Sequence, residues 1–152
     1  MIFPYVRHLV DRSPAVPSGE VARPEIPLLI SGPNGTIEVS ALLDTGADHV
    51  FLPAALAQLL GIEIDETIAD SARGAGGHEI SIWPGEVELA ISGNGESFRW
   101  RAQVGFVQSD DDLAAAYLGH AGFLEHYVAK FDYREQTVEL LPYADFLRET
   151  AS

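Results

Sequence analysis

A strand that ends on an acid is the feature of this sequence that most constrains its fold. The segment Ile37–Leu43 alternates apolar and polar residues and then becomes fully apolar, which predicts a strand that enters the core. It runs directly into Asp44-Thr45-Gly46, an arrangement suited to a tight loop with room beside the carboxylate. A second interpretation stays open, in which Asp44 only caps a turn through its side chain.

Turn signals divide most of the remaining chain into short strands. Segments 33–35 (PNG) and 93–95 (GNG) each separate two strand-like runs, which predicts β-hairpins, and another hairpin is expected before Pro142. Helices are predicted within 52–61, with Leu56, Leu59 and Leu60 on one face, and near 122–127. Since no repeat is present, we predict a mostly β fold with barrel-like closure and two short helices.

The length of the chain indicates one domain. With 152 residues, of which 47% are hydrophobic, it can bury one ordinary core. Several prolines near the start predict an extended N-terminal arm over residues 1–23. We expect the single domain over residues 24–148 and a C-terminal tail over residues 149–152.

The charge of the chain argues against two classes of partner. Asp and Glu number 23 against 9 Lys and Arg, a formal net charge of −14, which disfavours binding to nucleic acids or anionic membranes. A solvated acidic surface explains this charge, and a preference for basic partners is the sharper alternative. The chain has no cysteine, secretory signal or membrane-spanning apolar run, so we expect a cytoplasmic protein.

Metal and cofactor sites find little support in the sequence. Asp110, Asp111 and Asp112 lack the ligand spacing and the glycine of a calcium loop, so a solvated loop or helix cap is expected there. His120 and His126 lack a third zinc ligand at a suitable spacing. Phosphate-binding loops and Ser, Thr or Cys nucleophile signatures are absent, and we predict no metal and no cofactor.

The stretch ALLDTGADHVFLP, residues 41–53, resembles the active-site segment of the retropepsins, the retroviral-type aspartic proteases. In that family apolar residues precede Asp-Thr-Gly-Ala-Asp and further apolar residues follow it. Residues 114–140 resemble the family's apolar-Leu-Gly motif, short helix and final hairpin, in the same order. The resemblance covers most of residues 24–141 and implies the closed barrel of these proteases.

The resemblance also implies a reaction and an oligomeric state. Aspartic proteolysis uses two carboxylates that share one proton: the ionised one activates water, and the protonated one polarises the scissile carbonyl. This chain has one Asp-Thr-Gly and is too short for two lobes, so the second carboxylate must come from another copy. We therefore expect a homodimeric aspartic endopeptidase with a peptide or protein substrate. The alternative is a non-catalytic dimeric module of the same fold that binds peptides or assembles complexes.

Roles at the active-site loop follow from the same resemblance. Asp44 is the catalytic acid and base, and the Thr45 hydroxyl locks the two loops of the dimer together. Gly46 permits the tight backbone and turns its carbonyl to the substrate. Ala47 lacks the hydroxyl that pepsin-like enzymes often have, which predicts activity in a mildly acidic to neutral range. Asp48 supports the loop and touches the substrate backbone.

The second motif, Leu118, Gly119 and His120, departs from the family at its last position. Many members have Arg there, whereas His is charged only part of the time near neutral pH. Either His120 forms a pH-sensitive pair with Asp48, or an arginine of the arm, such as Arg7 or Arg12, takes this role.

The segment Gly74, Ala75, Gly76 and Gly77 resembles the retropepsin flap, a hairpin that closes over the bound peptide. Glycines at this density predict a mobile hairpin tip on their own account. An ordinary glycine-rich hairpin is the alternative interpretation.

Overall fold

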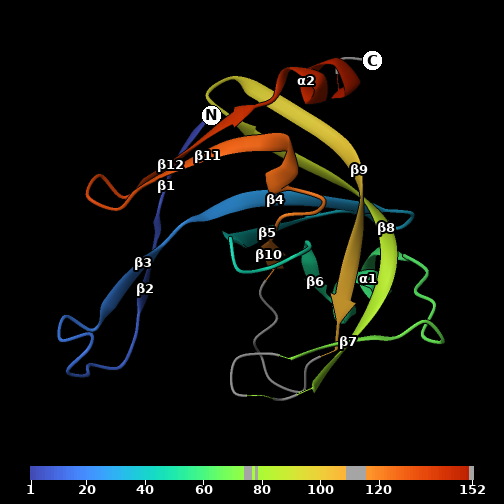
Figure 1. Cartoon of the computed structure of the whole chain (residues 1–152), viewed down its shortest axis with the longest axis horizontal. Coiled ribbons are helices and arrows are strands. Elements are labelled where there is room, and N and C mark those ends of the chain that lie inside the picture. The colour runs from blue at the N-terminus through green and yellow to red at the C-terminus, as the bar shows by residue number, and fades with distance from the viewer. Residues whose placement is uncertain (74–76, 78, 109–115, 151–152) are drawn as a thin grey trace.

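Strands joined by short connections make up most of the molecule (Figure 1). The structure, a computed structural model, describes residues 1–73, 77, 79–108 and 116–150. The strands are β1 (Ile2–Pro4), β2 (Val6–Leu9), β3 (Glu20–Arg23), β4 (Glu25–Gly32), β5 (Gly35–Leu43), β6 (Phe51–Pro53), β7 (Asp70–Arg73), β8 (Glu79–Gly93), β9 (Glu96–Val107), β10 (Ala116–Leu118), β11 (Tyr127–Asp132) and β12 (Thr137–Pro142). The helices are α1 (Ala54–Leu60), the 3-10 turn η1 (Leu124–His126) and α2 (Ala144–Thr150).

Six of the described strands close into a barrel in the order β4, β5, β10, β6, β9, β8, and pairing between β8 and β4 closes the ring. β7 extends the sheet beyond β8. Most neighbours are antiparallel, but β5 pairs with β10 and β6 pairs with β9 in parallel. The barrel is filled by apolar side chains, and the largest fully buried ones include Phe106, Phe123, Ile26, Leu28, Ile30, Leu52, Leu89 and Leu118. The predicted fold, mostly β with a closed barrel, is confirmed.

Local turn chemistry accounts for the predicted hairpins. Between β8 and β9, Asn94 and Gly95 have φ angles of 52° and 81°, the left-handed pair that an Asn-Gly hairpin turn requires. β4 and β5 pair up to Gly32 opposite Gly35, which leaves a two-residue connection. Both hairpins therefore lie where the sequence predicts them.

The first helix follows β6 directly and differs from the prediction in its buried face. α1 ends at Leu60, and Gly61, with a φ of 69°, forms the left-handed C-cap that favours glycine. Ala57 and Leu60 are its buried residues, whereas Leu59 is 63% exposed. The predicted apolar face is thus wrong at Leu59, because the helix is only two turns long and rests on the barrel by one edge.

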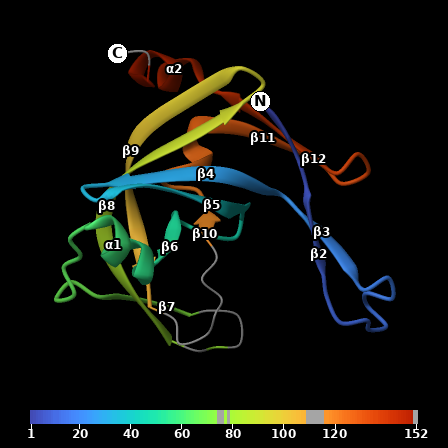
Figure 2. The same ribbon diagram turned by 180° about the vertical axis from the view of Figure 1, so that it is seen from behind.

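The two ends of the chain meet on the barrel body. β1 pairs with β12, and β12 with β11, in a three-stranded sheet whose inner face includes Phe3. The Leu140 N–H donates to the Met1 carbonyl at 2.8 Å, and the Met1 side chain is buried. Residues 1–5 of the predicted arm therefore contribute to or pack against the core, and residues 6–23 project from it (Figures 1 and 2). The division at residues 24 and 148 stays a prediction.

Helix α2 covers an aromatic cluster at the same end of the barrel, and the sequence pattern did not predict this helix. Its buried residue Phe146 lies with its ring centroid 5.4 Å from Trp100 and 5.2 Å from Tyr127. Among the described residues, no helix is long and apolar enough to cross a membrane. The cytoplasmic location stays a prediction.

Tyr127 is buried in this cluster with an unpaired hydroxyl. No described residue forms a hydrogen bond with its Oη. Burial raises the pKa of Tyr127 above its usual value of 10.0. Because the folded protein holds the phenol proton more tightly than the unfolded chain, the stability linked to this proton is complete below about pH 10 and declines at higher pH.

Replacing Tyr127 by Phe tests this orphaned hydroxyl. We expect Tyr127→Phe to raise the free energy of unfolding by about 1 kcal/mol at pH 7, since an unsatisfied buried polar group is removed. The loss of stability above pH 10 should also become less steep. Urea denaturation at pH 7 and pH 10.5 measures both effects, with Tyr133→Phe as the control because Tyr133 is 77% exposed. A destabilised Tyr127→Phe variant would contradict the assignment.

Candidate active site

The acid that ends the predicted strand lies at the junction of β5 and β10. β5 stops at Leu43, which is paired with Leu118 of β10 in the parallel register. The Asp44 N–H donates to the Leu118 carbonyl at 3.1 Å. The two motifs recognised in the sequence are therefore adjacent, and one fixes the backbone of the other.

The loop after Asp44 is tight and partly self-capped. Asp44 Oδ1 accepts a hydrogen bond from the Gly46 N–H at 2.8 Å, and the Asp44 carbonyl accepts one from the Ala47 N–H at 3.2 Å. Asp44 thus caps its own turn through its side chain, as the second interpretation of the sequence predicts. Its Oδ2 accepts no hydrogen bond from the described residues. Thr45, Gly46 and Asp48 are exposed, while Ala47 is buried beneath them.

The second motif crosses this loop with backbone hydrogen bonds. The His120 and Ala121 N–H groups donate to the carbonyls of Ala47 and Asp48 at 3.0 and 2.9 Å. In return, the Val50 N–H donates to the Ala121 carbonyl at 3.0 Å. These bonds hold the loop between β5 and β6 against the chain that leaves β10.

Gly119 makes the crossing possible. A Cβ atom at this position would lie 2.3 Å from the His49 carbonyl oxygen and 2.4 Å from that of Ala47. Both are backbone atoms within the hydrogen-bonded crossing, so neither can move aside easily. The glycine is required by the close approach of two backbones, whatever the chemistry of the loop.

His120 supports the loop in a way that the sequence did not predict. Its Nε2 lies 2.7 Å from the Thr45 carbonyl oxygen. A carbonyl only accepts hydrogen bonds, so Nε2 carries the proton, and this donor is present in both the neutral ring and the imidazolium. The contact therefore does not depend on the charge of His120.

The expected ion pair of Asp48 is not formed within the described chain. No described cation lies within ion-pair distance of the Asp48 carboxylate, and His120 is turned to Thr45 instead. Arg7 pairs with Glu20 at 3.3 Å and contacts Gln136. Neither pairing expected for Asp48, with His120 or with an arginine of the arm, is therefore formed within the described part of this protomer, and the partner of Asp48 stays a prediction.

The segment predicted to be the flap lies between β7 and β8, two antiparallel strands whose last paired residues are Arg73 and Glu79. Gly77 has a φ of 81°, a conformation that favours glycine. Gly74, Ala75 and Gly76 lie outside the described residues, so the flap stays a prediction. Residues 110–112 also lie outside them.

Two contacts of the loop could not be found from sequence. The Leu43 N–H donates to the Pro24 carbonyl at 3.0 Å, which joins the loop to the base of the N-terminal arm. His49 forms an isolated parallel bridge with Ala121. Both are backbone contacts between distant segments, and backbone atoms leave no residue-specific signal in one sequence.

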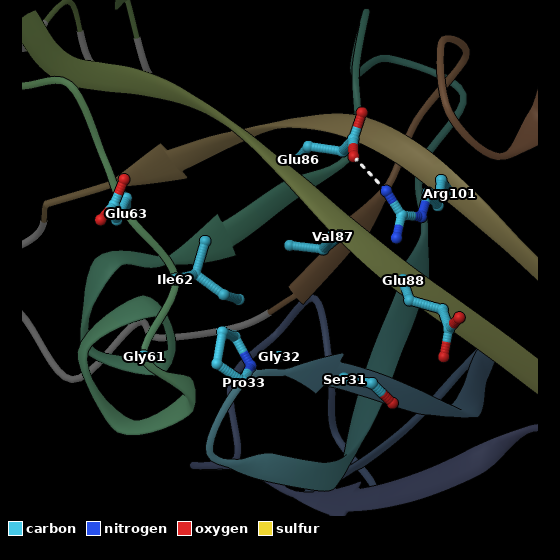
Figure 3. A pocket seen from close by; sticks show the side chains of 10 residues that line it. All are labelled: Ser31, Gly32, Pro33, Gly61, Ile62, Glu63, Glu86, Val87, Glu88 and Arg101. Carbon is cyan, nitrogen blue, oxygen red and sulfur yellow. Dashed lines mark hydrogen bonds and ion pairs between the residues drawn. The ribbon is translucent and has the colours of Figure 1, made fainter.

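A separate pocket opens where the β4–β5 turn, the end of α1 and β8 meet (Figure 3). Its volume is about 630 Å³, and Glu86 at its wall pairs with Arg101 at 3.0 Å. None of residues 44–48 lines it. Within the described chain, no group of three His, Asp or Glu side chains could hold a metal ion.

The model of one protein family, described as aspartyl protease, matches residues 26–119, more than half of the chain. The chain belongs to the aspartyl protease family. The match includes the Asp44 motif and the second motif as far as Gly119, and His120 lies just beyond it. A comparison of the sequence with curated proteins found no match.

Solved structures similar to this aspartyl protease family member are also retropepsin-like. A retropepsin-like aspartic protease from Rickettsia conorii is 20% identical, with a TM-score of 0.50 over 90% of this chain and 98% of that one, and so shares the fold. EIAV protease in complex with the inhibitor HBY-793 is 26% identical, with a TM-score of 0.43 over 64% of this chain and 82% of that one. The retroviral protease-like domain of Ddi1 from Leishmania major is 18% identical, with a TM-score of 0.45 over 82% and 98%.

Substitution of Gly119 tests the crossing. We expect Gly119→Ala to lower the free energy of unfolding by about 3 kcal/mol, because the new methyl group overlaps two carbonyl oxygens. Gly95→Ala is the control: its φ of 81° is unfavourable for alanine, but nothing lies within 4 Å of the new Cβ, so a cost of about 1 kcal/mol is expected. Chemical denaturation measures both, and equal costs would show that close approach is not the constraint at Gly119.

Variants of His120 distinguish a neutral hydrogen bond from an ion pair. His120→Leu removes the donor to Thr45 and should cost about 1 kcal/mol of folding stability, while His120→Gln keeps a donor and should cost less. Asp48→Asn removes the charge that an ion pair would need, and we expect little change. Thermal unfolding between pH 5 and 8 checks these outcomes. If Asp48→Asn costs as much as His120→Leu, an ion pair supports the loop after all.

Proposed function

We propose that this protein is an aspartic endopeptidase whose active site forms between the Asp44 carboxylates of two identical chains. The observation that carries the proposal is the exposed loop with Asp44 at its start, held by the second motif of the same family. The loop presents one carboxylate per chain, and the reaction needs two. A two-fold dimer that joins the exposed faces of two such loops supplies the pair.

The chemistry of the pair follows from ordinary acid–base catalysis. The ionised Asp44 takes a proton from a water molecule as the water oxygen bonds to the peptide carbonyl carbon, and the protonated Asp44 of the other chain donates its proton to the carbonyl oxygen. When the resulting tetrahedral intermediate collapses, the carboxyl that took the proton of water donates it to the nitrogen and the C–N bond breaks. The other carboxylate takes a hydroxyl proton back as the carbonyl re-forms. Because the two chains are identical, neither carboxylate has a separate role before substrate binds.

Other residues of the loop serve this pair by position. The Gly46 N–H bonds one oxygen of Asp44 and so orients the carboxylate. Thr45 is exposed next to it, where its hydroxyl can reach the loop of a second copy. Asp48 and the Gly46 carbonyl are assigned to the substrate backbone, and the hairpin of β7 and β8 to the flap. Leu118, Gly119 and His120 hold the loop from behind.

Cleavage of a peptide library tests the enzyme directly. We expect hydrolysis in a mildly acidic to neutral range and a loss of about 10³-fold or more in Asp44→Asn, because one proton-transfer group is removed from each half of the site. Asp145→Asn makes the same chemical change on the exposed side of α2 and should leave the rate unchanged. Cleavage that survives in Asp44→Asn would rule out the two-carboxylate mechanism. A folded dimer without cleavage at any pH would favour a peptide-binding module.

Mixing the wild type with Asp44→Asn tests whether the site is shared between chains. If subunits exchange freely in an equal mixture, about one quarter of the dimers hold two Asp44 carboxylates, whereas independent monomers would retain about half of the activity. Activity should therefore follow the square of the wild-type fraction across a mixing series. A linear dependence would overturn the homodimeric site. Sedimentation of the same mixtures confirms that dimers are present.

A further inference from the structure

Residues 6–23, here called the arm, form a two-stranded hairpin of β2 and β3 that stands away from the barrel (Figures 1 and 2). Among the described strands, β2 and β3 pair only with each other. A two-stranded hairpin without a further strand or packed face is at best marginally stable in water. The arm therefore has the form of an element that is completed by contact with another surface.

The arm is nevertheless held in one direction. At its base, His8 Nε2 lies 2.7 Å from Glu25 Oε1, and the Ser40 hydroxyl donates to Glu25 Oε2 at 2.8 Å. Glu25 is buried, so this network links β2 firmly to β4 and β5 of the barrel. Arg7 reaches Gln136 in the β11–β12 turn at 3.2 Å.

Its distal loop is ordered by its own backbone. The Val10 N–H donates to the Gly19 carbonyl at 3.0 Å, and Ser13 and Val16 exchange backbone hydrogen bonds at 3.2 and 3.0 Å. A loop built in this way keeps its shape as it leaves the barrel. The arm thus presents a defined surface at a fixed angle.

The base of the arm lies beside the candidate active-site loop. Pro24, the residue after the arm, accepts the hydrogen bond from Leu43, the residue before Asp44. Both views show the arm on the side of the barrel at which β5 ends (Figures 1 and 2). A second chain that brings its Asp44 to this one must therefore approach past the arm.

The charge of the arm is opposite to that of the remaining chain. The arm has a net charge of +1, from Arg7, Arg12 and Arg23 against Asp11 and Glu20. Since the whole chain has a formal net charge of −14, the remaining residues together carry −15. Complementary charges of this kind guide association and fix orientation. The acidic barrel of a second copy is thus a suitable surface for the arm.

Apolar groups on the arm point to the same conclusion. Leu9 is 89% exposed near the end of β2, and Val6 is exposed at its start. Burial of an exposed Leu side chain at an interface is favourable, and nothing in the described chain covers it.

We propose that the arm docks on the acidic barrel of a second copy of this chain. Each protomer of the dimer then contacts the other through its arm, beside the paired Asp44 loops. This inference rests on the proposed function, because that function requires the two loops to meet. Arg12 and Arg23, which form no ion pair with the described residues, pair with carboxylates of the other barrel, and Leu9 is buried against it. The arm then sets the strength and register of the dimer without touching the reacting atoms.

Cross-linking from the arm identifies its partner. The chain has no cysteine, so Leu9→Cys can carry a benzophenone maleimide as the only such label. In a mixture of ¹⁴N and ¹⁵N protein, cross-links between chains contain both isotopes, and cross-links within one chain contain one. We expect mixed products joined to the barrel of the other copy, and few from Leu147→Cys on α2, which lies at the far end of the molecule (Figure 1). Products within single chains only would show that the arm folds over its own barrel and would overturn the proposal.

Charge reversal on the arm measures its contribution to the dimer. We expect Arg12→Glu to weaken the dimer about tenfold in sedimentation over a concentration series, and Leu9→Ser to weaken it similarly, with the effect of Arg12→Glu reduced at high salt. Arg148→Glu makes the same charge change on α2 and should dimerise like the wild type.

The outcomes separate this proposal from the proposed function. If the wild type dimerises and cleaves peptide, and the arm variants dimerise equally well, the docking of the arm is ruled out and the proposed enzyme is not affected. If the wild type stays monomeric, or dimerises without cleaving peptide, the proposed function itself is ruled out. Peptide cleavage lost in Arg12→Glu without any change in dimerisation would assign the arm to substrate instead and overturn the docking proposal.

Discussion

The crossing of residues 44–50 by residues 118–121 is the constraint on which the rest of the structure depends. The bonds at this crossing are backbone hydrogen bonds, and they join segments about seventy residues apart. Such a contact forms only after the intervening chain has folded back, and its entropic cost must be offset by many neighbouring contacts. The parallel pairs β5–β10 and β6–β9 supply them on either side. The barrel therefore closes and the Asp44 loop takes its shape in the same folding step.

Local signals were sufficient for the parts of the fold that depend on neighbouring residues. The Asn-Gly turn at residues 94 and 95 and the glycine that ends α1 each impose one backbone conformation, and the structure has it at both positions. The loop at Asp44 was recognisable for the same reason, since an acid, a small residue and a glycine allow few alternatives. The closed barrel followed from the number and spacing of such segments.

Contacts between distant segments escaped prediction. Nothing in the first four residues indicates that Phe3 packs in the core opposite Val138, because prolines nearby suggest an extended arm and do not say what it touches. His120 raises the same difficulty in another form. A family that uses Arg at this position suggests an ion pair, whereas the shorter imidazole reaches the nearer carbonyl of Thr45. The partner of a side chain depends on its length and on which acceptors surround it, and a sequence shows only the first.

A chain with this charge faces a specific difficulty if its active site is shared between two copies. Two barrels, each strongly acidic, repel one another as they approach, and the repulsion opposes the pairing that the reaction requires. At physiological ionic strength charges more than about 8 Å apart are largely screened, so the groups nearest the interface decide the outcome. In the proposed dimer the arginines of the arm lie against the acidic barrel of the other copy, where they offset the local repulsion, while the acidic groups elsewhere remain solvated. The position of a few cations is thus more important for assembly than the net charge of the whole chain.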